Sequence, residues 1–256
     1  MTKADLAADL EAARRGRFTI TSRRGTGDAV SLDDAYELGQ DLERERALAC
    51  WRPAGWKLGF TNQALWSKLG LDRPIRARIY DETLCAGDLN SADLVQPRIE
   101  PEIVVGFGAD VRQMSDTDVI AAAVEWVAAG LEVVQCHFDR WEMTPAEAVA
   151  DAGVHAALAI GPRTRVDADV VRSLGAATCQ VLLDGVVTAT GSGTDVLGGP
   201  LDALRWLLKG LPDGLRAGEI VTTGTLTQAM PLQPGQRWEH RLSASVLLEP
   251  VQLRIC

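Results

Sequence analysis

Short apolar runs separated by Gly, Pro and Asp turns fill most of the chain after Trp51, and this texture constrains the fold more than any other feature. Runs of this length that are rich in β-branched residues predict strands. We expect strands at 56–60, 99–107, 131–136, 156–160, 178–183 and 219–223, with further strands in the alternating stretch 237–255. Asp184-Gly185 lies between two apolar runs and predicts a two-residue hairpin turn.

Helical patterns begin the chain and interrupt these strands. Residues 2–16 have apolar residues at helical spacing, and Ser31 is expected to cap a second helix that ends near Ala49. Two further helices are predicted at 116–129 and 200–209. Because helices and strands do not alternate regularly, we predict an α+β fold with a mixed, largely antiparallel β core and peripheral helices.

The predicted organisation is an N-terminal helical segment, 1–50, followed by a β-rich catalytic domain, 51–256, in what we expect to be one structural unit. A chain of 256 residues can bury a sizeable core without disulfides or structural zinc. No internal repeat or low-complexity tract interrupts it.

The net charge of −9 argues against nucleic acid or an anionic membrane as the main partner, because both require a basic surface. It does not exclude an anionic substrate in a locally positive cleft. The five cysteines are scattered without a CxxC pair, which is typical of reduced thiols and not of a zinc site. No apolar run reaches the roughly 20 residues that span a bilayer. We therefore expect a cytoplasmic protein.

Two carboxylates in the segment 98–107 are the most informative chemical feature. Residues i and i+2 of a strand point to the same face, so Glu100 and Glu102 would lie side by side, roughly 7 Å apart along the backbone. Pro101 between them cannot donate a ladder hydrogen bond, which places the pair at an edge, a bulge or a rim. Carboxylates crowded in a partly dry place need a shared proton, a cation or a metal.

Glu132 is the natural third ligand, because it lies in an apolar strand pattern just after a predicted helix. An all-oxygen set selects Mg²⁺, Mn²⁺ or Ca²⁺ over zinc. Spacing alone leaves a second interpretation equally open, in which all three glutamates are solvated strand residues. For Lys57, between apolar residues, the pattern alone favours a solvent-facing side chain, and the alternative is a cation for a substrate carboxylate or for proton transfer.

Other chemical motifs are weaker. The Gly-rich stretch 190–200 leads into a helix but matches neither the dinucleotide nor the P-loop pattern. His137, His155 and His240 are the only histidines, and they form no HExxH motif. No GxSxG nucleophile motif is present.

Five segments in register resemble the 2-keto-4-pentenoate hydratase / 4-oxalocrotonate decarboxylase family, within the fumarylacetoacetate hydrolase superfamily. They are 55–61 (GWKLGFT), 96–102 (QPRIEPE), 125–134 (EWVAAGLEVV), 191–207 (GSGTDVLGGPLDALRWL) and 216–224 (RAGEIVTTG). The resemblance implies a β-roll core and Mg²⁺ or Mn²⁺ held by the three glutamates. It implies a homo-oligomer as well, with a complex with a pathway partner enzyme as a further expectation. It also implies a small anionic 2-oxo acid substrate, without a nucleic acid or membrane partner.

The resemblance carries further roles onto single residues. It implies a substrate or proton-transfer role for Lys57, an acid–base role for Asp81, and substrate-lining positions for Ser192 and Thr225. The expected reaction is hydration of a 2-hydroxy-2,4-dienoate to a 4-hydroxy-2-oxo acid, as in aromatic meta-cleavage catabolism.

Three segments depart from the family pattern: Gln135-Cys-His137, Ala152-Gly-Val-His155, and the basic Arg76-Ala-Arg78 before Asp81. They leave two alternatives open. One is decarboxylation of a 2-oxo-3-enedioate, for which Arg76 and Arg78 would bind a second carboxylate. The other is hydrolysis of a C–C bond, for which His137 or His155 beside a free carboxylate would activate water. A non-catalytic binding protein is disfavoured, because buried carboxylates are costly to keep without a role.

Overall fold

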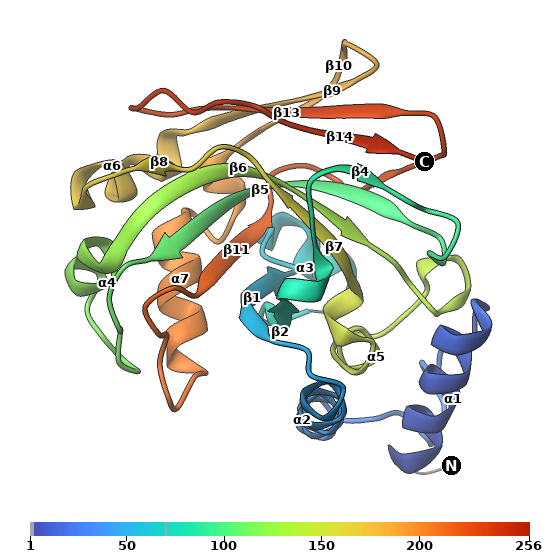
Figure 1. The fold of residues 1–256 in the computed structure, drawn as a ribbon. Coiled ribbons are helices and arrows are strands. Elements are labelled where there is room, and N and C mark those ends of the chain that lie inside the picture. Colours follow the sequence, from blue (N-terminus) through green and yellow to red (C-terminus); the bar gives the residue numbers. More distant parts are fainter. Residues whose placement is uncertain (1–2, 70) are drawn as a thin grey trace.

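The computed structural model describes residues 3–69 and 71–256. Two helices, α1 (Lys3–Gly16) and α2 (Leu32–Leu48), open the chain as predicted. The Ser31 side chain caps α2 by accepting a hydrogen bond from the backbone N–H of Asp34. Both helices lie on the side of the molecule away from the smaller sheet (Figure 1), and α2 packs against α5 (Pro145–Ala150).

A large, strongly curved sheet forms the centre of the molecule (Figure 1). Its main path runs β2-β1-β11-β5-β6-β7-β3, with β12 paired to β5 and β8 paired to β6. Among the described strands of this sheet, β1–β11 and β3–β7 are the parallel pairs. The strands are β1 (Pro53–Gly59), β2 (Ile75–Tyr80), β3 (Leu84–Cys85), β5 (Arg98–Phe107), β6 (Val124–Val134), β7 (His155–Ile160), β8 (Thr164–Arg165), β11 (Ile220–Thr225) and β12 (Met230–Pro231).

A smaller sheet packs over the curved one, in the order β10-β9-β13-β14-β4. Trp238 and Leu253 from this sheet join Ile103 and Leu131 of the curved sheet in the main apolar core. Its strands are β4 (Gly87–Leu89), β9 (Thr178–Leu183), β10 (Val186–Ser192), β13 (Arg237–Ser243) and β14 (Val251–Ile255). The predicted mixed, largely antiparallel β core with peripheral helices is therefore confirmed.

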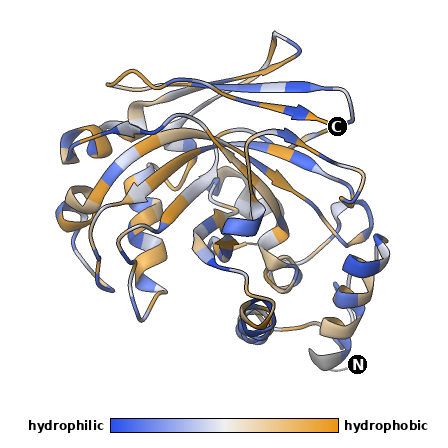
Figure 2. Cartoon of the chain, in the orientation of Figure 1, coloured by the Kyte–Doolittle hydropathy of each residue, from blue (hydrophilic) through white to orange (hydrophobic). Residues whose placement is uncertain are grey.

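The two faces of β5 have different chemistry, and this difference positions the site. Ile99 and Ile103 face the main core, whereas the alternate residues Glu100, Glu102 and Val104 occupy the other face. The curved sheet carries long apolar stretches, whereas α2 is largely hydrophilic (Figure 2). The glutamates thus lie among long apolar stretches of the curved sheet.

The helix predicted at 116–129 is wrong over its second half. Helix α4 (Thr117–Ala123) ends early, and β6 begins at Val124. β-branched and aromatic residues, including Val124, Trp126 and Val127, favour a strand that is buried on both faces, and pairing with β5 decides the outcome. A buried strand without alternation resembles a buried helix in sequence.

The turn predicted at Asp184-Gly185 and the helix predicted at 200–209 are confirmed, whereas β2, α5 and two short helices were not predicted. Asp184 and Gly185 both have positive φ, 50° and 84°, as a two-residue hairpin turn between β9 and β10 requires. Three further helices are α3 (Trp66–Leu69), α6 (Ala168–Ser173) and α7 (Pro200–Lys209). Within residues 3–69 and 71–256, no helix is long and apolar enough to cross a membrane.

Candidate active site

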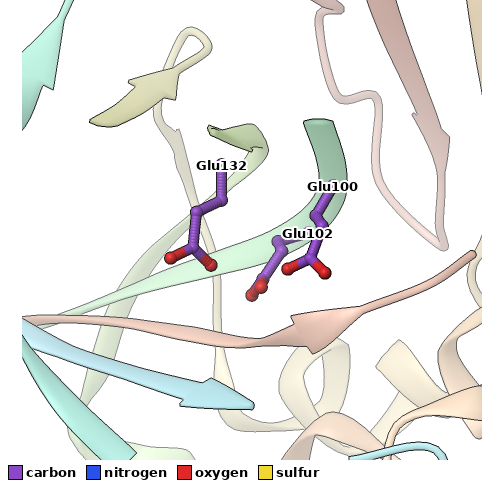
Figure 3. Close-up of side chains that lie close together, drawn as sticks. All are labelled: Glu100, Glu102 and Glu132. Atoms are coloured by element: carbon purple, nitrogen blue, oxygen red, sulfur yellow. The ribbon is translucent and has the colours of Figure 1, made fainter. Parts of the chain in front are cut away.

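Three glutamates from two adjacent strands converge. Glu132 on β6 lies directly opposite Glu100 on β5 in the antiparallel register, and Glu102 follows two residues along β5. One oxygen from each side chain lies within 4.8 Å of the others. Figure 3 shows the three carboxylates directed toward a common space. The strand pairing therefore brings Glu132 to the pair that the i, i+2 pattern predicted.

Glu102 and Glu132 each have one oxygen held and one oxygen free. Glu102 Oε2 accepts a hydrogen bond from the backbone N–H of Gly224 at 2.7 Å. Glu132 Oε1 lies 3.2 Å from Lys57 Nζ and 2.7 Å from His155 Nδ1. Among the described residues, the buried atoms Glu102 Oε1 and Glu132 Oε2 have no hydrogen-bond partner. Orphaned buried carboxylate oxygens in an all-oxygen cluster fit a hard divalent cation.

The ion-free cluster has strongly perturbed acidities. Burial raises the pKa of Glu100 to about 7, with Lys57 opposing and Glu132 adding to the rise. Burial and the Glu132 charge raise the pKa of Glu102 well above its usual value. Burial alone would raise the pKa of Glu132, but Lys57 and His155 overcome it and hold that pKa at about 2. Glu100 and Glu102 thus retain protons that a cation would displace.

Lys57 is the buried cation of the site. Its Nζ donates to the carbonyl of Gly153 at 3.2 Å and pairs with Glu132, which occupies two of its three N–H groups. Burial alone would lower the pKa of Lys57, but the three glutamates overcome that effect and raise it. Lys57 is therefore positively charged at neutral pH and suited to hold an anion.

A cavity of about 360 Å³ opens beside this cluster. Lys57, Glu100 and Thr225 line it, and Arg98 joins them from the start of β5. Its apolar wall comes from segments far apart in the sequence, namely Phe60, Leu71, Ile75, Trp141 and Met143. The cavity therefore combines a polar end at Glu100 and Lys57 with an apolar wall that suits a short carbon chain.

Arg98 is a cavity residue that the sequence analysis did not single out. It precedes Glu100 by two residues and so shares its strand face. Its guanidinium stacks 4.4 Å from the ring centroid of Trp141, and no ion pair of Arg98 is found among the described residues. The i, i+2, i+4 spacing of Arg98, Glu100 and Glu102 was the available signal.

The other predicted site residues have different positions. The hydroxyl of Thr225 at the cavity wall donates to the carbonyl of Thr227 at 2.9 Å. Asp81 is exposed and forms an ion pair with Arg52 at 3.1 Å, and Ser192 contacts Thr194 at the end of β10. Neither Asp81 nor Ser192 lines the cavity. The roles expected for Asp81 and Ser192 stay predictions, because neither side chain lies at the cavity.

The variant segments also separate in space. Arg76 stacks on Tyr36, and Arg78 stacks on Trp56 and pairs with Glu219, outside the glutamate cavity. The expectation that Arg76 and Arg78 bind a second substrate carboxylate therefore loses its basis.

The two histidines of the variant segments have different partners. The Nδ1 atom of His137 lies 2.9 Å from Asp151 Oδ1, and neither residue lines the glutamate cavity. Of the two, only His155 contacts the cluster, through Glu132.

Comparisons with known proteins agree with this geometry. Residues 81–249 match the family model described as fumarylacetoacetate (FAA) hydrolase C-terminal. The chain is 32% identical to a 2-keto-4-pentenoate hydratase of Burkholderia vietnamiensis, covering 87% of each chain. It is 29% identical to a 2-hydroxyhexa-2,4-dienoate hydratase of Comamonas testosteroni, covering 90% of this chain and 89% of that one.

Solved structures share the fold. A 4-oxalocrotonate decarboxylase from Pseudomonas putida G7, complexed with magnesium and adipate, superposes with a TM-score of 0.89 at 24% identity, covering 99% of this chain and 97% of that one. A fumarylpyruvate hydrolase from Pseudomonas aeruginosa, in complex with Mn²⁺ and pyruvate, gives a TM-score of 0.60 at 15% identity, covering 78% of this chain and 88% of that one.

Proposed function

The chain belongs to the fumarylacetoacetate hydrolase C-terminal family, and on this premise we propose that it is a divalent-metal-dependent lyase. The reaction we assign is hydration of a 2-hydroxy-2,4-dienoate to a 4-hydroxy-2-oxo acid. One observation carries this proposal. Two buried carboxylate oxygens, Glu102 Oε1 and Glu132 Oε2, have no hydrogen-bond partner among the described residues, and they lie beside a cavity that a buried lysine lines. The activities named for the hydratase relatives suit the same site.

Glu100, Glu102 and Glu132 are the residues that would hold the cation, and we propose Mg²⁺ or Mn²⁺ for an all-oxygen set. When bound, the cation would supply Lewis-acid polarisation of the substrate's 2-oxo group. The protein's contribution is to fix the donor oxygens: Gly224 holds Glu102, whereas Lys57 and His155 hold Glu132.

Lys57 orients the anionic head of the substrate. Its third N–H is left for a substrate oxygen, because Glu132 and Gly153 occupy the other two. Its raised pKa keeps it protonated, so we assign it to binding and charge stabilisation and not to proton abstraction. We therefore do not assign the role of general base to Lys57.

The apolar wall holds the unsaturated tail. Phe60, Trp141 and Met143 line the cavity beyond the glutamates and would keep bulk water from the diene. Tautomerisation gives a 2-oxo-3-enoate, and one water then adds its hydroxyl at C4 and its proton at C3. The 2-oxo group withdraws electrons from the C3–C4 double bond and so directs the hydroxyl to C4.

Decarboxylation of a 2-oxo-3-enedioate is a second candidate, and Arg98 favours it. The side chain offers a guanidinium to the cavity without a carboxylate partner in the described part of the chain. A guanidinium suits the bidentate recognition of a second substrate carboxylate. The C–C hydrolase alternative lacks such support, because the carboxylate beside His155 is Glu132, a member of the cluster, and is not free.

The wider setting follows the sequence expectations. We propose a small anionic 2-oxo acid as the substrate and a cytoplasmic homo-oligomer as the working form. We also propose that this oligomer assembles with a pathway partner enzyme. Size-exclusion chromatography with light scattering tests the oligomer, since a monomer at micromolar concentration contradicts it.

The proposed reaction is tested by product identification. Purified protein is incubated with 2-hydroxypenta-2,4-dienoate and, separately, with a 2-oxo-3-enedioate, each with Mg²⁺ and with EDTA. We expect a 4-hydroxy-2-oxo acid from the first substrate, with Mg²⁺ only. Release of CO₂ from the diacid alone transfers the assignment to decarboxylation. No turnover of either substrate under any condition refutes both assignments.

A further inference from the structure

His155 contacts Glu132 and is not among the residues that line the cavity. Its Nδ1 is 2.7 Å from Glu132 Oε1, and its Nε2 is 2.8 Å from the hydroxyl oxygen of Thr83. The histidine is only 5% exposed and does not line the cavity. It therefore cannot touch a substrate there, and any effect on the reaction must pass through Glu132.

An irregularity in the strand pairing turns His155 toward Glu132. Leu158 on β7 pairs with Glu132 and Ala157 with Val133, but Val134 pairs with His155 instead of Ala156. In a regular strand, His155 would face the side opposite to Leu158, because the two are three residues apart. The one-residue shift brings it to the face of Glu132, and bulges re-aim side chains in this way.

The contacts of His155 and Lys57 divide the two oxygens of Glu132 between different tasks. Both Lys57 Nζ and His155 Nδ1 lie within hydrogen-bonding distance of Oε1, whereas Oε2 is buried without a partner among the described residues. A carboxylate held by one flexible ammonium can rotate about its terminal torsion and exchange its oxygens. An imidazole anchored at its far nitrogen by Thr83 restricts that rotation.

We propose that His155 is a positioning residue, which fixes the Glu132 carboxylate so that Oε2 alone is offered to the cation. This inference rests on the proposed function, because it assumes that the glutamate cluster binds a divalent ion. It assigns a purpose to one of the segments that depart from the family pattern, Ala152-Gly-Val-His155. Thr83 holds the far nitrogen of His155 and so contributes to the same positioning.

The test measures Mn²⁺ affinity by electron paramagnetic resonance, independently of turnover. His155→Ala removes the bond to Glu132, and we expect a 10- to 100-fold higher Kd, in the range typical of outer-shell ligand partners. His155→Asn keeps a donor near the Nδ1 position and should restore the Kd to within about fivefold of wild type. Thr83→Val removes the anchor of His155, together with the contacts of the hydroxyl to the backbone of Tyr80, and should raise the Kd by about three- to tenfold.

A matched control exists in His137, which is also buried and also bonded to a carboxylate, that of Asp151. His137→Asn should leave the Mn²⁺ affinity unchanged, since Asp151 lies outside the cluster. Glu102→Gln distinguishes a failure of the positioning role from a failure of the metal site. If Glu102→Gln weakens Mn²⁺ binding while His155→Ala and Thr83→Val do not, only the positioning role is overturned. If none of them changes the affinity, the metal site itself is wrong.

Discussion

Lys57 and Glu132 form a fully buried ion pair, with Nζ 3.2 Å from Oε1. The two residues come from strands that do not pair with each other, since β11 and β5 lie between β1 and β6 in the sheet. The sheet is strongly curved (Figure 1), and the two side chains are in contact although two strands separate β1 from β6. This pair joins the substrate-binding cation to the proposed metal ligands, so a change at either residue should affect both tasks.

Replacement of Lys57 by Met should destabilise the ion-free protein and remove turnover. Loss of the ammonium leaves Glu132 as a buried charge with only His155 as its partner, which costs about 3 kcal/mol for a broken buried pair. Urea unfolding in EDTA measures the stability, and steady-state kinetics with Mg²⁺ measures turnover. Asp81→Asn serves as the comparison and should keep turnover within about threefold, because Asp81 is exposed beside Arg52. A loss at Asp81 as large as that at Lys57 would contradict the geometry described.

Gly153→Ala tests how tightly the backbone segment that holds Lys57 is packed. Gly153 has φ of +65°, and an added Cβ would lie 2.6 Å from Ala77 Cβ and 3.3 Å from Lys57 Cδ. We expect a destabilisation of about 2–3 kcal/mol, from backbone strain and from the clash. Gly185→Ala is the control, since its φ is +84° but nothing lies within 4 Å, so only about 1 kcal/mol of strain is expected. Equal effects in urea unfolding would show that the packing around Lys57 is not tight.

The pH dependence follows from Glu100, whose pKa is raised to about 7 from 4.5 in the ion-free protein. The folded state holds this proton more tightly than the unfolded chain. Its contribution to stability is therefore complete below about pH 4.5 and is lost as the pH rises through about 7. Mn²⁺ must displace this proton and the one that Glu102 holds, so its affinity should change in the opposite sense and rise by at least about tenfold per pH unit below about pH 7. Calorimetric Mn²⁺ titrations between about pH 5.5 and 8 measure this, and a flat profile is the contrary result.

Arg98→Met distinguishes the two candidate substrates. If the guanidinium binds a second carboxylate, kcat/KM for a 2-oxo-3-enedioate should fall about 100-fold, whereas the value for a 2-hydroxy-2,4-dienoate should change less than about tenfold. Met retains the apolar contact with Trp141. Equal losses for both substrates would assign Arg98 to the shared head group or to packing.

Local rules predicted a large part of the fold. The Ser31 cap, the Asp184-Gly185 turn and the strand around Glu100 follow from the backbone preferences of neighbouring residues. The end of α4 does not, because the apolar run after Ala123 suits either a buried strand or a buried helix until β5 pairs with it. Tertiary pairing thus decided what periodicity left ambiguous.

Local sequence rules also predicted only part of the candidate site. The i, i+2 rule on β5 predicted that Glu100 and Glu102 share a face. The strand patterns also singled out Glu132 and Lys57, and the family resemblance favoured their functional roles over solvated ones. His155 was not predicted as a partner of Glu132, because the irregular pairing of β7 changes the face of one residue and leaves no signal in the alternation. Asp81 and Ser192 were placed by resemblance alone, and neither residue lines the cavity.

The central claim is that the three glutamates hold one divalent cation, and a Mn²⁺ titration of the wild type and Glu102→Gln tests it most directly. Glu125→Gln is the matched control, because Glu125 lies on β6 with Glu132 but is exposed and paired with Arg165. We expect one Mn²⁺ per chain, a Kd at least about 100-fold higher for Glu102→Gln, and an unchanged Kd for Glu125→Gln. Equal Mn²⁺ affinity in wild type and Glu102→Gln would contradict the account.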